Sequence, residues 1–140
     1  LYKSLSQRLT GCFMSAAVKV YQEDGFTMVD IKNGTMVDMA LELSIYRQRH
    51  TLFGQHHQEK QLAIYVGRIE GLDFGASRYA CGADFASITE AKVLVLESAL
   101  NRTYANMMLQ MNKPAFPVYT CTSIKQARAL LREKHPRTSV

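Results

Sequence analysis

The sequence predicts a single α/β domain, because apolar strand patterns alternate with amphipathic helix patterns along a chain of 140 residues. A hairpin pattern comes first, and three short apolar runs follow, each separated from the next by a helix pattern. A composition of 47% hydrophobic and 21% charged residues fits one globular domain, which buries roughly two thirds of its unfolded surface. We therefore expect the order ββαβαβαβα and a mixed, mostly parallel sheet with helices packed against it.

The first half of the chain predicts a β-hairpin followed by a helix. Apolar residues alternate in residues 18–31 on either side of Asp24 and Gly25, and an Asp-Gly pair supplies the positive φ of a tight turn. Thr35 is expected to cap a helix that has Asp38 at its third position. The 3,4 spacing predicts one buried stripe, made of Val37, Ala40, Leu41, Ser44 and Ile45. Charged residues are expected off this stripe: Asp38, Glu42, Arg47 and Arg49.

The second half predicts three further strands with helices between and after them. Residues 62–66, 92–96 and 116–119 are short apolar runs, typical of strands covered on both faces. Asp73 is expected to open a short helix between the first two runs, and Ser123 to cap the last helix. The two longer C-terminal helices each have an apolar face. The first face is Leu100, Tyr104, Met107, Met108 and Met111, and the second is Ile124, Ala127, Leu130 and Leu131.

The net charge of +5 lies mainly at the two ends of the chain. Basic residues exceed acidic ones in residues 1–13 and 125–140, whereas residues 14–124 are close to neutral. A nucleic-acid-binding domain concentrates basic residues on its folded body, so we expect no nucleic-acid partner. No apolar run approaches the roughly 18 residues of a membrane span, so we expect no membrane partner either.

The N-terminus and the cysteines indicate the limits and compartment of the domain. Because Met14 begins a stretch that resembles a natural opening, we predict that residues 1–13 are a tag or an upstream extension. The domain is then expected over residues 14–135, with a tail at residues 136–140. Three cysteines without CxxC spacing favour reduced thiols and a cytoplasmic protein. They are Cys12, Cys81 and Cys121.

One cluster has the side chains of a metal site. His56 and His57 are adjacent, with His50 and Glu59 near by. Adjacent histidines point apart in regular structure, and residues 51–60 read as the frayed end of a helix and a polar loop. We therefore favour a solvated loop, and predict no metal and no other cofactor.

A second group of polar residues lies where open α/β sheets bind ligands. Ser98, Asn101, Arg102 and Asn106 open a helix directly after a buried strand, and could converge on an anion or on a partner's backbone. The alternative is that Ser98 or Asn101 only caps the helix. The glycines after the preceding strand form neither GxGxxG nor a Walker loop, so nucleotide chemistry is not expected.

Residues 90–131, EAKVLVLESALNRTYANMMLQMNKPAFPVYTCTSIKQARALL, resemble the STAS-like domains, the SpoIIAA-like class of anti-sigma-factor antagonists. The similarity extends to uncharacterised bacterial STAS-like proteins and covers about Val18 to Glu133. Phosphoregulated members of the class have Asp-Ser-(Ser/Ala)-Gly at the start of a helix. In this chain the corresponding residues are Asp73, Phe74 and Gly75. The nearest serine lies one turn further on, so the resemblance indicates Ser77 as the candidate phosphoacceptor.

These observations together predict a non-enzymatic, STAS-like regulatory or protein-interaction domain. No nucleophile is placed beside a base, so we predict no catalytic residues. The resemblance implies a protein partner or a homodimer, and the methionine stripe at residues 107–111 is either core or a self-association surface. The alternative function is binding of a small ligand or anion at residues 98–106. The expected binding surface comprises Asp73, Gly75, Ser98, Asn101, Arg102 and Asn106.

Overall fold

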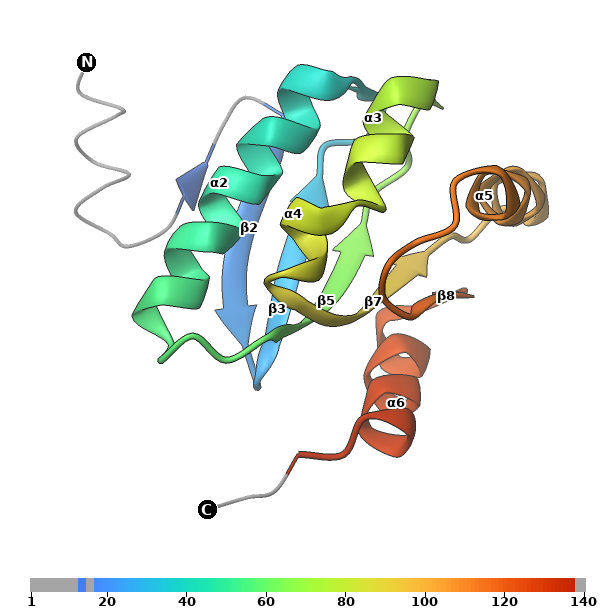
Figure 1. Cartoon of the computed structure of the whole chain (residues 1–140). Coiled ribbons are helices and arrows are strands. Elements are labelled where there is room, and N and C mark those ends of the chain that lie inside the picture. The colour runs from blue at the N-terminus through green and yellow to red at the C-terminus, as the bar shows by residue number, and fades with distance from the viewer. Residues whose placement is uncertain (1–12, 15–16, 138–140) are drawn as a thin grey trace.

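The computed structural model describes residues 13–14 and 17–137, which form a six-stranded sheet with helices packed on it (Figure 1). The strands are β1 (Phe13–Met14), β2 (Val18–Glu23), β3 (Phe26–Ile31), β4 (Met36–Val37), β5 (Gln61–Val66), β6 (Gly71–Leu72), β7 (Thr89–Val95) and β8 (Val118–Cys121). The helices are α2 (Met39–Gln55), α3 (Phe74–Ala80), α4 (Ala83–Ala86), α5 (Ala99–Met111) and α6 (Ile124–Lys134). The sheet order is β1-β2-β3-β5-β7-β8, and β4 pairs separately with β6.

The predicted fold class is confirmed: the sheet is mixed and mostly parallel. β2 pairs antiparallel with β1 and β3, whereas β3–β5, β5–β7 and β7–β8 are parallel pairs. The order ββαβαβαβα is present from β2 to α6, with the short elements β1, β4, β6 and α4 added to it. Asp24 and Gly25 form the predicted hairpin turn, with φ angles of 53° and 83°. Two positive φ angles are what a two-residue type I′ turn requires.

Successive side chains of each strand enter two different apolar cores, because a strand presents alternate residues to opposite faces. On one face, Val29 and Ala63 pack with residues of α2, α3 and α4. On the other face, Met28 and Ile64 pack with α6. Figure 1 shows α2, α3 and α4 together in front of the sheet, and α5 to one side of them. The sheet is therefore covered on both faces, as the unbroken apolar runs predict.

The start and end of α2 differ from the prediction. Asp38, not Thr35, is the N-cap, and its Oδ1 accepts a hydrogen bond from the Leu41 N–H at 2.9 Å. The reason is that β4 pairs with β6, which keeps the chain extended up to Val37. At the other end the helix continues through the expected frayed segment to Gln55.

The buried arc of α2 is also broader than the predicted stripe. Glu42 and Arg49, expected off it, are only 4% and 0% exposed, whereas Ala40 is exposed. The apolar periodicity misses these residues because it counts only apolar side chains. Arg49 is buried because polar side chains of the sheet satisfy its guanidinium. Glu42 is buried without such partners, since its Oε1 has no hydrogen-bond partner.

The Arg49 guanidinium joins α2 to two central strands. Its Nε donates to Gln61 Oε1 at 2.7 Å, its Nη1 to Tyr65 Oη at 3.1 Å and its Nη2 to Thr89 Oγ1 at 2.6 Å. Gln61 Nε2 returns a hydrogen bond to the Arg49 carbonyl at 2.8 Å. The guanidinium also lies 5.5 Å from the centroid of the Phe85 ring. All three hydrogen-bond acceptors are uncharged, so no carboxylate hydrogen-bonded to it balances this buried cation.

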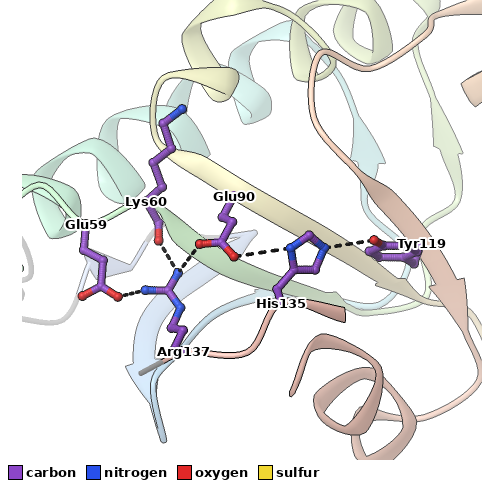
Figure 2. A network of polar contacts seen from close by, with 6 residues as sticks. All are labelled: Glu59, Lys60, Glu90, Tyr119, His135 and Arg137. Atoms are coloured by element: carbon purple, nitrogen blue, oxygen red, sulfur yellow. Dashed lines mark hydrogen bonds and ion pairs between the residues drawn. The ribbon is translucent and has the colours of Figure 1, made fainter. Parts of the chain in front are cut away.

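Three residues near the C-terminal end of the described chain, Arg128, His135 and Arg137, contact acidic groups of the domain. Arg128 forms ion pairs with Glu23 and Asp24 at 3.0 and 3.1 Å, and so ties α6 to the hairpin turn. Beyond α6, Arg137 contacts two glutamates and a backbone carbonyl (Figure 2). His135 bridges Glu90, 3.3 Å from its Nδ1, and the Tyr119 hydroxyl, 2.9 Å from its Nε2. Two of the C-terminal arginines are therefore paired with acidic residues of the fold.

Two sequence predictions concern the ends of the chain. Residues 1–12 lie outside the described residues, but Phe13 and Met14 pair with β2, so the sheet includes one residue of the predicted extension. Arg137 lies in the predicted tail and contacts the domain. Between residues 17 and 137, no helix is both long and apolar enough to cross a membrane.

Replacing Arg49 with lysine is expected to lower the free energy of unfolding by about 2–4 kcal/mol, because one ammonium cannot serve three acceptors in a planar fork. The matched control is Arg47→Lys, since Arg47 lies exposed on the same helix. Urea denaturation followed by circular dichroism measures both. Equal stability of the two variants would contradict this role of Arg49.

Candidate functional site

A cavity of about 510 Å³ lies between α2, α3, α5 and the carboxyl ends of β5 and β7. This volume is typical of pockets for small organic ligands. Val66 and Val95, the last residues of β5 and β7, line it. Open α/β sheets bind ligands at this edge, because loops and helices diverge beyond the carboxyl ends of parallel strands.

The walls of the cavity are mostly apolar. The sheet contributes Leu94, the loop after β5 contributes Ile69, and α5 contributes Ala105, Met108 and Leu109. At one end, which we call the rim, the lining residues are exposed: Glu70, Leu100 and Tyr104. At the other, which we call the buried end, the polar lining residues are all less than 9% exposed. They are Glu42, Ser77, Cys81 and Lys92.

The Glu42 carboxyl lacks protein partners at the buried end. Its Oε1 is buried and has no hydrogen-bond partner. Burial raises the pKa of Glu42 above its ordinary value of 4.5, although the positive charges of Lys92 and Arg49 act in the opposite direction. Protonation of this carboxyl is therefore easier than protonation of an exposed glutamate.

Lys92 is the only basic residue among those that line the cavity. It is 8% exposed, and its Nζ lies 4.1 Å from the centroid of the Tyr65 ring. Within the described residues, no carboxylate oxygen lies within 4.0 Å of this ammonium. The Tyr65 hydroxyl accepts a hydrogen bond from Arg49, which fixes the ring beneath the ammonium.

The structure separates the sequence-predicted site residues into two groups. Ser77 on α3 and Asn101 on α5 both line the cavity. The others do not line it. Asp73 caps α3 by accepting from the Ala76 N–H at 3.1 Å, and Ser98 caps α5 by accepting from the Asn101 N–H at 3.3 Å.

Arg102 and its neighbours also lie outside the cavity. Arg102 Nη1 donates to the carbonyls of Leu96 and Glu97 at 2.8 and 3.0 Å. These hydrogen bonds fix the backbone just before α5. Gly75 and Asn106 are exposed on α3 and α5. The capping alternative for the start of α5 therefore holds for Ser98, and Arg102 contacts backbone carbonyls.

Two further predictions concern single residues. Ser77 is 5% exposed and lines the cavity, so its hydroxyl is not at the surface where a kinase would reach it; its phosphorylation stays a prediction. His57, in the expected polar loop, has a positive φ of 57°. Among the residues that the structure describes, no group of three potential metal ligands is brought together.

Sequence reasoning missed Glu42 and Lys92, the two charged groups of the buried end. For Lys92 a signal was present, because it shares the strand face of Leu94 within a run of inward-facing residues. For Glu42 the apolar pattern carries no such signal. Glu42 directly follows Leu41 of the predicted buried stripe, and a charged residue beside such a stripe is usually solvated.

Comparison with known proteins assigns the family. The model of a domain of unknown function, DUF7793, matches residues 20–134. The chain belongs to the DUF7793 family. No curated protein matches it. The DUF7793 match spans β3 to α6 entirely, and so includes every element around the cavity.

Among solved structures, this DUF7793 domain is similar to an uncharacterised protein of the DUF3478 family with a SpoIIAA-like fold, from Shewanella loihica PV-4. The two share 11% sequence identity with a TM-score of 0.52, over 85% of this chain and 99% of the other. The fold of this domain is thus SpoIIAA-like, as the resemblance to STAS-like domains implied. At this identity the similarity shows the fold alone.

Replacing Glu42 with glutamine is expected to stabilise the domain increasingly as the pH rises above 4.5. The folded state, where the pKa of Glu42 is raised, binds more protons than the unfolded state in this range, so the wild-type chain loses stability with rising pH. The difference in Tm between variant and wild type should be smallest below pH 4.5 and grow toward neutral pH. A difference that does not change with pH would contradict the burial of an unpaired carboxyl.

Proposed function

We propose that this domain binds a small, mostly apolar molecule in the cavity and does not transform it chemically. The observation that carries the proposal is the buried end, where the Glu42 carboxyl lacks a partner beside the Lys92 ammonium. An unsatisfied buried polar group costs about 1–3 kcal/mol, and a bound ligand with a polar end removes that cost. The apolar walls supply the remaining contact surface.

Binding is favoured over catalysis because the nucleophile candidate at the site is not activated. Burial raises the pKa of the Cys81 thiol, and the effect of Glu42 adds to it, although Lys92 opposes both. A thiol of raised pKa is a poor nucleophile at neutral pH. The alternative function, binding of a small ligand, is therefore supported mainly by the buried end of the cavity and not by residues 98–106 alone.

Filling the apolar part of the cavity is expected to abolish binding. Ala105 lines the cavity on α5, whereas its exposed neighbour Asn106 does not. With the neutral dye Nile red as the probe, wild type should show saturable fluorescence enhancement, and Ala105→Phe should weaken it by at least about tenfold, as steric exclusion from a pocket predicts. Asn106→Phe serves as the control and should bind like wild type. Absence of saturable binding to wild type, or equal losses in both variants, would count against the proposal.

A second candidate function, self-association, is favoured by the exposed face of α5. Only Met108 of this helix is buried. Residues of the predicted apolar face are exposed instead, with exposed fractions of 77% for Leu100, 48% for Met107 and 59% for Met111. Such a stripe is typical of a helix that packs on another protein surface. Its occupant in this proposal is a second copy of the chain, in line with the expected homodimer.

Placing charges on the stripe is expected to prevent dimerisation. The variant Met107→Glu with Met111→Glu puts two carboxylates on the apolar face, whereas Thr103→Glu with Gln110→Glu puts two on exposed polar positions of the same helix. Sedimentation velocity should show a dimer for wild type and the control, and a monomer for the methionine variant. A monomeric wild type at high concentration would exclude this candidate.

A further inference from the structure

We infer that the ligand is a monoanion, a carboxylate on an apolar body, and that Lys92 and Glu42 together hold its carboxylate at the buried end of the cavity. The inference rests on the proposed function, since it specifies the ligand of the same cavity. It is carried by the balance of buried charge, by the donors that the buried end presents and by the apolar walls between there and the rim.

The interior of the domain has an excess of positive charge. Among the buried side chains that the structure describes, three carry ionisable charges: Glu42, Arg49 and Lys92. Arg49 is hydrogen-bonded only to uncharged oxygens, and Lys92 has no carboxylate within ion-pair distance in the described part of the chain. Buried charges are normally paired, because an unpaired one has lost its hydration without compensation. One negative charge supplied by a ligand beside Lys92 would provide this compensation.

The buried end also presents donors that match a carboxylate. The Lys92 ammonium has three N–H groups, and within the described residues none has a hydrogen-bond or ion-pair partner. At the same end the buried Oε1 of Glu42 has no hydrogen-bond partner, and this carboxyl donates one hydrogen bond when it is protonated. A ligand carboxylate has two oxygens, so one can accept from Lys92 and the other from Glu42. This arrangement needs no charged residue other than Lys92 and Glu42.

Charge also argues against the other ligand classes. A cationic head would face Lys92 with no ionised partner except Glu42, whose own environment disfavours ionisation. A phosphate dianion would bring two negative charges against the single lining cation and beside a carboxyl. A neutral head would leave the Lys92 charge uncompensated. The carboxylate monoanion is the class that satisfies both groups at once.

The rest of the cavity fits an apolar body. The apolar side chains that line the cavity include Val37, Leu72, Leu94, Val95, Met108 and Leu109. Glu70 and Tyr104 at the rim are exposed, so water can solvate their polar groups. The far end of the ligand therefore needs no polar group to pair with them. An acid with an unbranched apolar chain of medium length therefore represents the class.

Titration calorimetry of the 140-residue chain with decanoate, decanol and decylamine tests the inference. The three probes share one apolar chain and differ in the charge of the head. Decanoate is expected to bind at least about tenfold more tightly than decanol, because a hydrogen bond from an ammonium to a carboxylate is stronger than one to a neutral hydroxyl, and decylamine should bind most weakly. This comparison uses the wild-type chain, so it does not depend on whether a variant folds.

Lys92→Met then identifies the group that reads the charge. The variant keeps the apolar bulk and should reduce decanoate affinity by at least about tenfold while decanol affinity stays or rises. The control Lys125→Met removes an exposed lysine on α6, the helix that packs on the opposite face of the sheet, and should behave like wild type. Circular dichroism and the Tm of each variant confirm that it is folded.

Each outcome separates the ligand class from the proposed function. Equal binding of decanoate and decanol, or a preference for decanoate that survives Lys92→Met, overturns the carboxylate inference and leaves the cavity as an apolar binding site. If none of the three probes binds and Nile red does not bind either, the proposed function fails together with it. A preference for decanoate that Lys92→Met removes and Lys125→Met keeps supports the inference.

Discussion

The buried guanidinium of Arg49 is the interaction on which the rest of the site depends. It fixes α2 against β5 and β7 through three hydrogen bonds, and α2 in turn positions Glu42 at the cavity. It also holds the hydroxyl of Tyr65, whose ring lies beneath Lys92. Arg49 thus positions Glu42 and orients the Tyr65 ring that lies beneath Lys92. Because the acceptors are uncharged, the cost of burying this cation is not offset by a carboxylate hydrogen-bonded to it.

The main strands and helices could be predicted from local patterns, whereas the short β4–β6 pair and the polar interior could not. The hairpin follows from Asp24 and Gly25, because few dipeptides adopt two positive φ angles, and Asp73 and Ser123 cap helices as expected. Glu42 and Arg49 are different. Whether a charged residue of a helix is buried depends on partners from strands far along the chain, and apolar periodicity contains no information about them.

The cavity lies at the edge of the sheet where a site was expected, and Ser77 and Asn101 line it, whereas the other expected side chains do not. The rule that ligands bind beyond the carboxyl ends of strands points to residues 98–106, and the cavity does extend to Asn101. The cation in that segment, Arg102, instead donates hydrogen bonds to the backbone just before α5. The cation that faces the cavity, Lys92, comes from within a strand. Basic residues near the C-terminus likewise serve the fold, since Arg128 and Arg137 contact acids of the domain.

Few side chains of α5 are buried, so the wall of the cavity that α5 forms tolerates substitution more easily than the buried end does. Because only Met108 of this helix is buried, most substitutions along it would change the shape of one cavity wall at little cost to folding. Glu42 and Lys92 lie on elements that the Arg49 network holds together, so the positions of these two side chains are fixed by the core. During divergence of such a domain, the size and outline of the cavity can drift through α5. The places of the two charged side chains at its buried end change only together with the packing of α2 on the sheet.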